Sequence, residues 1–90
     1  MKPEEIIDIF KEKGTQCTMY RDDPTSLVYG LYECKILEIL VTLKCGTELT
    51  IFCGESTVID ISKNEDEYAG FGSTLVSPMK DIECIEVKWR

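Results

Sequence analysis

Residues 39–53, ILVTLKCGTELTIFC, predict a β-hairpin, because two runs rich in apolar and β-branched residues flank one glycine. With Gly46 at the centre of the loop, like positions match across the hairpin, in the pairs Leu43–Leu49, Val41–Ile51, Ile39–Cys53, Lys44–Glu48, Thr42–Thr50 and Leu40–Phe52. A shift of half a residue would set apolar side chains opposite polar ones, so the pattern favours this register. Leu40 and Phe52 share the face with the polar end, which predicts that this face is covered near the sheet centre.

The segment that follows Pro3 and ends before Gly14 predicts an amphipathic helix. Pro3 suits the first helical turn, and Gly14 suits a left-handed cap after the last turn. Ile6, Ile9 and Phe10 fall at positions i, i+3 and i+4, so they form one apolar stripe. A helix of about eleven residues is not stable alone, so we expect this stripe to pack on a sheet.

Alternating apolar segments predict further strands over residues 15–20, 26–36, 57–62, 74–77 and 82–89. Between them we expect a turn over residues 21–25, a loop over residues 63–73 and a bulge or close approach at Gly30. The pattern predicts an α+β fold in a single domain spanning residues 1–90. Its N-terminal helix would pack on five or six antiparallel strands, in a sheet that is open or curled into a small SH3-like or Sm-like barrel.

The order of helix and strands resembles that of the Sm-like RNA-binding barrels over residues 39–87. The residues that carry the resemblance are VTLKCG at 41–46, DISKN at 60–64 and the closing apolar strand. The resemblance implies a small curled barrel. No RNA-binding residue is carried over, because the chain is acidic and lacks a basic Arg-Gly-Asp-type motif before its last strand.

The chain of 90 residues has seventeen acidic and ten basic side chains, a net charge of −7, and no histidine. This charge repels phosphate backbones and anionic lipids and attracts basic partners. The missing histidine removes the usual general base and the commonest metal ligand. No apolar run approaches the ~20 residues that span a bilayer, and no signal peptide is visible, so we expect a cytoplasmic protein.

The five cysteines are widely spaced, at Cys17, Cys34, Cys45, Cys53 and Cys84. Zinc sites need pairs of ligands two to four residues apart, and this chain has no such pair. We therefore expect neither a metal nor another cofactor. The pattern favours reduced cysteines, several of them buried as small apolar residues.

Two acidic clusters, Asp22-Asp23 and Glu65-Asp66-Glu67, fall in predicted turns or loops. Neither has the alternate oxygen ligands of an EF-hand. They are either solvated loops or charged surfaces that could occupy a phosphate-binding groove on another protein.

Tyr68 and Phe71 follow the second acidic cluster and alternate with glycines in the segment YAGFG. Rings that anchor beside charges that steer are typical of a recognition loop. The alternative is that both rings fold back over an open end of the core. On the first interpretation, these two residues and the five acids form one partner-binding surface.

Three functions remain open. The first is a non-catalytic acidic protein-binding module, most specifically an inhibitor of a basic nucleic-acid-handling protein, as immunity proteins and phage-encoded anti-defence proteins are. The second is an assembly component whose exposed sheet edges pair between copies. The third is a small enzyme that uses carboxylates or a thiol, which the missing base and metal-ligand spacings disfavour. The expected partner is a basic protein, not nucleic acid and not a membrane.

Overall fold

The computed structural model describes residues 1–12, 17–32, 36–53 and 56–89. Its elements, in chain order, are α1 (Pro3–Glu12), β1 (Cys17–Asp22), β2 (Ser26–Tyr32), β3 (Ile36–Leu43), β4 (Glu48–Phe52), β5 (Ser56–Ser62), β6 (Tyr68–Phe71), β7 (Thr74–Pro78), the 3₁₀ turn η1 (Met79–Asp81) and β8 (Ile82–Trp89). The α+β class predicted from the sequence is confirmed.

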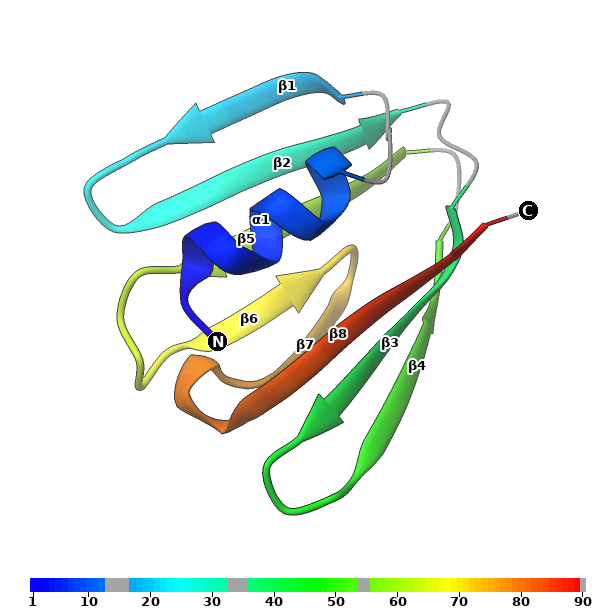
Figure 1. Ribbon diagram of the computed structural model, residues 1–90. Coiled ribbons are helices and arrows are strands. Elements are labelled where there is room, and N and C mark those ends of the chain that lie inside the picture. The colour runs from blue at the N-terminus through cyan, green and yellow to red at the C-terminus, as the bar shows by residue number, and fades with distance from the viewer. Residues whose placement is uncertain (13–16, 33–35, 54–55, 90) are drawn as a thin grey trace.

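The strands form two antiparallel sheets rather than one (Figure 1). The larger has the order β1-β2-β5-β6-β7, and the smaller has the order β4-β3-β8. The described residues thus contain eight strands, where the predicted sheet had five or six; all but β6 overlap segments that the sequence assigned to strands. Within these residues the two sheets do not join into a closed barrel, so the expected SH3-like or Sm-like closure is not seen.

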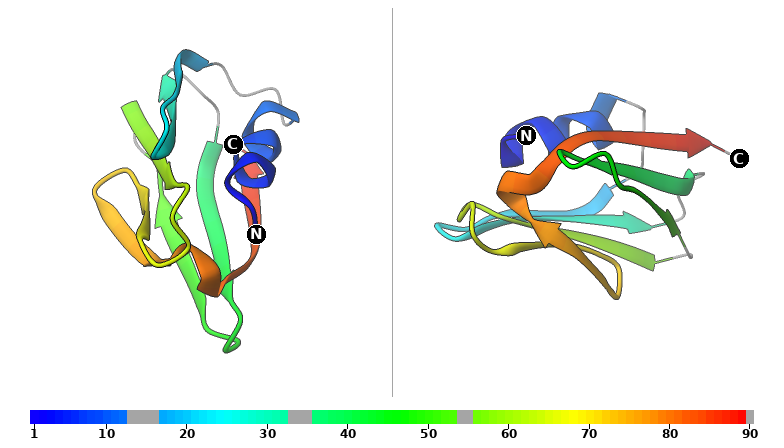
Figure 2. Two further views of the ribbon diagram at one scale, coloured as in Figure 1. Left: turned by 90° about the vertical axis from the view of Figure 1, so that its left-hand side faces the viewer. Right: turned by 90° about the horizontal axis from the view of Figure 1, so that it is seen from below.

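The two sheets lie in separate layers, and α1 lies beside β8 in the layer of the smaller sheet (Figure 2). The helix contacts β2, β5 and β8, so it covers the part of the larger sheet that the smaller one leaves open. Side chains from both sheets and the helix fill the core between the layers. They are Ile6, Ile7, Phe10, Leu27, Tyr29, Ile39, Val41, Ile51, Ile59, Ile61, Ala69, Phe71, Met79, Ile82 and Ile85.

The helix begins and packs as its sequence predicts. Glu4 and Glu5 occupy the first turn, where the positive end of the helix dipole favours acids. Ile6 and Phe10 are buried on the face toward the sheets, and the Phe10 ring stacks on Tyr29 with centroids 6.4 Å apart. The expected cap at residue 14 lies outside the described residues.

The predicted register of the hairpin is wrong by two residues, although its faces are right. Val41 lies opposite Leu49 rather than Ile51, and Thr42 lies opposite Glu48. Val41 and Ile51 still share the buried face, because a shift of two residues conserves the alternation of a strand.

The loop of the hairpin explains the shift. The Gly46 N–H donates to the Leu43 carbonyl at 2.9 Å, and the Leu43 N–H donates to the Thr47 carbonyl at 2.8 Å. The loop therefore has three residues and ends at Gly46, whose φ of 94° places it in the left-handed region. In three-residue hairpin loops the glycine takes this last position, not the central one that we expected.

The outer face of the smaller sheet is less covered than the sequence predicted. Leu40 is half-buried, but Phe52 is 74% exposed. Phe52 lies at the end of β4, on the edge strand of its sheet, so no neighbouring strand screens its ring on the side away from β3 within the described residues. The prediction that this face is covered is therefore wrong for Phe52.

One strand, β6, lies inside the segment that the sequence predicted to be a loop. Asp60 pairs with Gly70 and Gly70 pairs with Leu75, so β6 joins β5 to β7. The β6–β7 turn holds Gly72 at a φ of 65° in a two-residue loop, where glycine supplies the left-handed conformation. Two glycines near a four-residue strand weaken its sequence signal, because glycine is depleted in strands.

The other strand boundaries agree closely with the sequence. β5, β7 and β8 coincide within one residue with the predicted segments, whereas β1 runs on to Asp22. The predicted strand over 26–36 holds as far as Tyr32 and then leaves the described residues. The irregularity expected at Gly30 lies on the partner strand, between Cys17 and Met19.

We expect Gly46→Ala to lower the free energy of unfolding by about 1–2 kcal/mol, because an L-residue is strained in the left-handed region. Space is not the cause, since a Cβ at Gly46 would have no atom within 4 Å. Gly70→Ala is the control: this position has no positive φ, and its new Cβ would lie an ordinary 3.6 Å from Leu75 Cδ2. Urea unfolding measures both, and equal losses would contradict the assignment of the loop.

Candidate functional site

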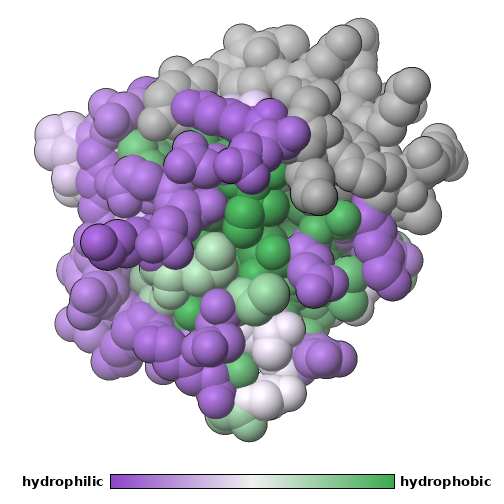
Figure 3. All heavy atoms as spheres, in the orientation of Figure 1, coloured by the Kyte–Doolittle hydropathy of each residue, from purple (hydrophilic) through white to green (hydrophobic). Residues whose placement is uncertain are grey.

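The two acidic clusters lie side by side at one end of the molecule, although 41 residues separate Asp22 from Lys63 (Figure 1). The Lys63 N–H donates to the Thr25 carbonyl at 2.8 Å, and the Lys63 ammonium forms an ion pair with the Asp22 carboxylate. Figure 3 shows hydrophilic residues gathered at this end, on the left of the view. The structure therefore brings together two segments that the sequence could not place relative to each other.

Basic side chains neutralise much of the charge of these clusters. Arg21 Nε lies 2.8 Å from Asp23 Oδ2, and Lys80 Nζ lies 3.0 Å from Asp66 Oδ1. With the Lys63–Asp22 pair, three of the five predicted acids thus have a cationic partner. Glu65 and Glu67 have no ion pair among the described residues.

The pair formed by Lys80 and Asp66 persists at neutral pH. The hydrogen bond that the Lys80 ammonium donates to the Asp66 carboxylate raises the pKa of Lys80, and the Asp66 charge adds to this effect. Because the folded pKa is raised, any stabilisation is complete below the ordinary lysine pKa of 10.5 and is lost as pH rises through the raised value. Both side chains are exposed, so solvent screening leaves the contribution small.

A hollow on the outer face of the larger sheet combines one exposed ring, one exposed leucine and two acids. We call it the acidic hollow and define it by Asp60, Glu67, Tyr68, Gly70 and Leu75; its volume is about 230 Å³. Tyr68 is 55% exposed and Leu75 is 71% exposed, although both are large apolar side chains. Gly70 lies between Asp60 and Leu75 in one row across three strands, and its missing side chain leaves the floor open.

The charges of the acidic hollow are available to a ligand. Glu67 Oε2 accepts a hydrogen bond of 3.4 Å from the Ser62 hydroxyl, and Asp60 is exposed. Neither carboxylate forms an ion pair within the described part of the chain. A ring beside two carboxylates that form no ion pair among the described residues suits a guanidinium or ammonium group, which can stack on the ring and pair with the acids.

Phe71 does not belong to this surface. Its side chain is 0% exposed and lies in the core, where Phe71 pairs with Ile59 across β5 and β6. Alternation along β6 sends Phe71 inward and Tyr68 outward, apart from a local register shift after Tyr68. Of the two predicted aromatic anchors, burial leaves only Tyr68 for a partner.

Sequence reasoning missed Asp60, Gly70 and Leu75. The alternation of residues 57–62 already placed Asp60 on the face opposite Ile59 and Ile61, which are buried. What the sequence lacked was β6, because only its pairing with both neighbours sets Asp60 in the same row as Leu75.

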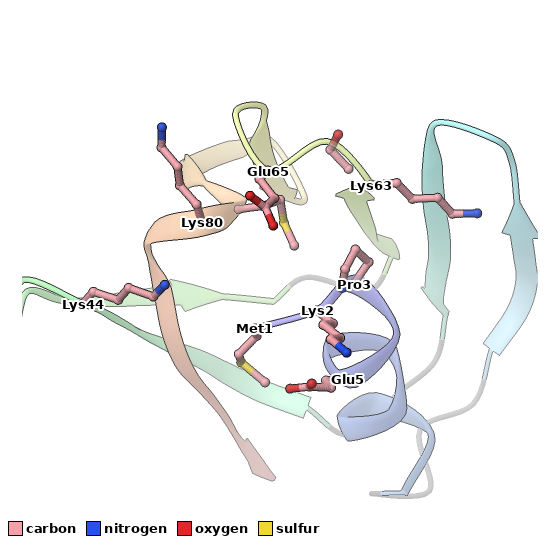
Figure 4. A pocket seen from close by; sticks show the side chains of 10 residues that line it. Met1, Lys2, Pro3, Glu5, Lys44, Lys63, Glu65 and Lys80 are labelled. Atoms are coloured by element: carbon pink, nitrogen blue, oxygen red, sulfur yellow. The ribbon is translucent and has the colours of Figure 1, made fainter.

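A second pocket, of about 350 Å³, lies between the start of α1 and η1 and has mixed charge (Figure 4). Its four lysines are Lys2, Lys44, Lys63 and Lys80. Figure 4 shows the Lys63 and Lys80 side chains pointing away from its centre, as their ion pairs require, while the Glu65 carboxylate points into it. Since Glu5 also lines the pocket, its charges do not single out an anion or a cation.

Cys45 departs from the expectation of buried cysteines. It is exposed in the hairpin loop, and its Sγ lies 3.3 Å from the Thr47 hydroxyl oxygen. The Thr47 side-chain and backbone hydrogen bonds lower the pKa of the thiol, whereas the charge of Asp81 raises it. No cation contributes to this shift, unlike the positive surroundings that activate catalytic thiols.

The remaining cysteines and the acids form no recognised centre in the described ranges. Cys53 and Cys84 are half-buried, and the side chains of Cys17 and Cys34 lie outside what the structure describes. Over residues 1–12, 17–32, 36–53 and 56–89, no three potential metal ligands converge. No helix within these ranges has the length and apolarity that a membrane crossing requires.

No protein-family model, curated protein or solved structure matches this chain. The resemblance to Sm-like barrels therefore receives no support from a known relative.

We expect Cys45 to react with iodoacetamide faster than Cys53 and Cys84, because it is the exposed thiol of the three. Thr47→Val removes the hydroxyl that stabilises the thiolate, so the pKa of Cys45 should rise and alkylation at pH about 8 should slow about threefold. Thr25→Val, at an exposed threonine away from Cys45, is the control. Mass spectrometry measures the rates, and an unchanged rate in the Thr47 variant would contradict the cause assigned to the shift.

Proposed function

We propose that the protein is a non-catalytic acidic protein-binding module that binds a basic protein through the acidic hollow. The observation that carries the proposal is the combination of exposed Tyr68 and Leu75 with the free carboxylates of Asp60 and Glu67. In its most specific form, the module inhibits a basic nucleic-acid-handling partner, in the manner of immunity or anti-defence proteins.

The electrostatic part of the proposal rests on sign and position. A net charge of −7 attracts a basic partner over the range of a Debye length, about 8 Å at physiological salt. At contact, the interaction depends on the local charges. Asp60 and Glu67 form no ion pair among the described residues, whereas Asp22, Asp23 and Asp66 already have cationic neighbours. A unit charge pair at 4 Å contributes about 1 kcal/mol in water and about 4 kcal/mol near a protein surface.

The apolar side chains of the acidic hollow supply contact area in addition to the charged groups. Tyr68 and Leu75 flank the open floor at Gly70, so a long basic side chain can lay its methylene stem on them. The charged end of that side chain then reaches the carboxylates at the rim. Rings at the centre with polar groups around them are the arrangement in which interface energy concentrates.

The proposal is tested with a peptide of alternating arginine and serine residues, followed by amide chemical shifts of the labelled protein. We expect the largest shifts at Asp60, Tyr68, Gly70 and Leu75. Asp60→Asn should weaken binding about fivefold, the effect of roughly 1 kcal/mol. The affinity should also fall several-fold between about 50 mM and about 300 mM salt, because screening acts on exposed charges.

Asp8→Asn is the matched control, since it removes the same charge from an exposed position on α1. Equal losses in the Asp60 and Asp8 variants would mean that only net charge matters, and the acidic hollow would be excluded. A response that is flat with salt would exclude the electrostatic mechanism.

A further inference from the structure

β4 is an edge strand whose outer side has no strand partner among the described residues. The hydrogen bond from the Leu43 N–H to the Thr47 carbonyl fixes which residues of β4 bond to β3. Because hydrogen-bonded pairs alternate in an antiparallel ladder, Leu49 and Ile51 direct their backbone groups toward β3. Glu48, Thr50 and Phe52 therefore direct their N–H and carbonyl groups to the open side.

The other three sheet edges carry features that discourage pairing. β1 has a register irregularity and the charged residues Arg21 and Asp22, and β7 ends in Pro78. The free side of β8 lies against α1. The sequence of β4, ELTIF, contains no proline and no lysine, and its pairing with β3 shows no bulge. Its one charged residue, Glu48, lies at the start of the strand. Exposed edges that have few charges and are neither bulged nor covered are templates for another strand.

A groove of about 540 Å³ runs beside this edge, between β4 and the β6–β7 turn. It is lined by Ile51, Phe52, Thr57, Val58, Phe71, Gly72, Ser73 and Thr74. None of these residues is charged, in a chain where charged residues make up 30%. Phe52 is the most exposed large apolar residue among those whose side chains the structure describes.

We propose that this edge joins two copies of the protein, with β4 of one copy antiparallel to β4 of the other. A twofold axis through Thr50 pairs Thr50 with its counterpart and sets Glu48 of each copy opposite Phe52 of the second copy. These are the residues whose backbone groups are directed outward, so the pairing satisfies hydrogen-bond donors and acceptors on both strands. The two smaller sheets become one six-stranded sheet.

The distribution of charge favours this uncharged surface for self-association. Two copies that each carry −7 repel each other, so they can approach only where the local surface is uncharged. The groove is such a surface. The antiparallel arrangement also separates the two Glu48 side chains by about four residues, roughly 13 Å at the rise of a strand, which exceeds the Debye length at physiological salt.

Sedimentation velocity of the purified chain over a range of concentrations tests the proposal. We expect a dimer whose population rises with protein concentration and with salt, because salt screens the repulsion between copies. Phe52→Glu sets two acids opposite each other and should give a monomer. The double variant Glu48→Lys, Phe52→Glu restores opposite charges across the axis and should recover the dimer.

Thr50→Pro tests the backbone contacts. Its lost N–H is directed away from β3, so the strand should still form, as proline is tolerated on edge strands. We expect a monomer with an unchanged circular dichroism spectrum, whereas Thr50→Val, which keeps the N–H, should remain dimeric. A wild-type chain that is monomeric up to about millimolar concentration would overturn the proposal, because specific dimers form well below it. So would a dimer that Phe52→Glu leaves intact.

Discussion

The burial of the apolar stripe of α1 is the interaction on which the rest of the structure depends. The smaller sheet is too narrow to cover the larger one, and Ile6, Ile7 and Phe10 fill the uncovered part beside β8. A helix of this length is not stable alone, so helix and sheets require each other. One helix can complete only one side of the smaller layer. The opposite side ends at β4, which explains why the exposed Phe52 and the uncharged groove lie there.

The fold was predictable where the apolar pattern is long and regular. Alternation assigned Val41 and Ile51 to the buried face, and the periodicity around Phe10 identified the helix. Alternation decides only which face of the sheet a residue occupies, so registers that differ by two residues fit it equally well. The choice between them depended on where Gly46 lies in its loop. The strand β6 was missed for a related reason: four residues that include glycine have too little pattern, and tertiary pairing with β5 and β7 defines them.

The candidate site was less predictable than the fold, because sequence gives the number of charges but not their neighbours. Asp22, Asp23 and Asp66 stand out in the sequence, yet each forms an ion pair in the structure. The partners of Asp22 and Asp66 are distant in sequence, whereas the partner of Asp23 is two residues away. Asp60 is inconspicuous in the sequence of its strand, but in the structure it lies in the acidic hollow with Tyr68 and forms no ion pair among the described residues. Phe71 and Tyr68 look alike in the sequence YAGFG, but Phe71 is buried and Tyr68 is exposed. The direction of a side chain, set by pairing, decides its role.

The two proposed surfaces respond to salt in opposite directions, since one depends on attraction and the other must overcome repulsion. Screening weakens the pull of the acidic hollow on a cation, whereas it removes the mutual repulsion of two chains of charge −7. The surfaces also share no defining residue: the acidic hollow lies on the outer face of the larger sheet, and the groove lies beside the edge of the smaller one. On these two proposals, low salt would favour a monomer whose acidic hollow attracts cations strongly, and high salt would favour a dimer whose acidic hollow attracts them less. If both proposals hold, ionic strength alone would shift the balance between partner binding and self-association, without any contact between the two surfaces.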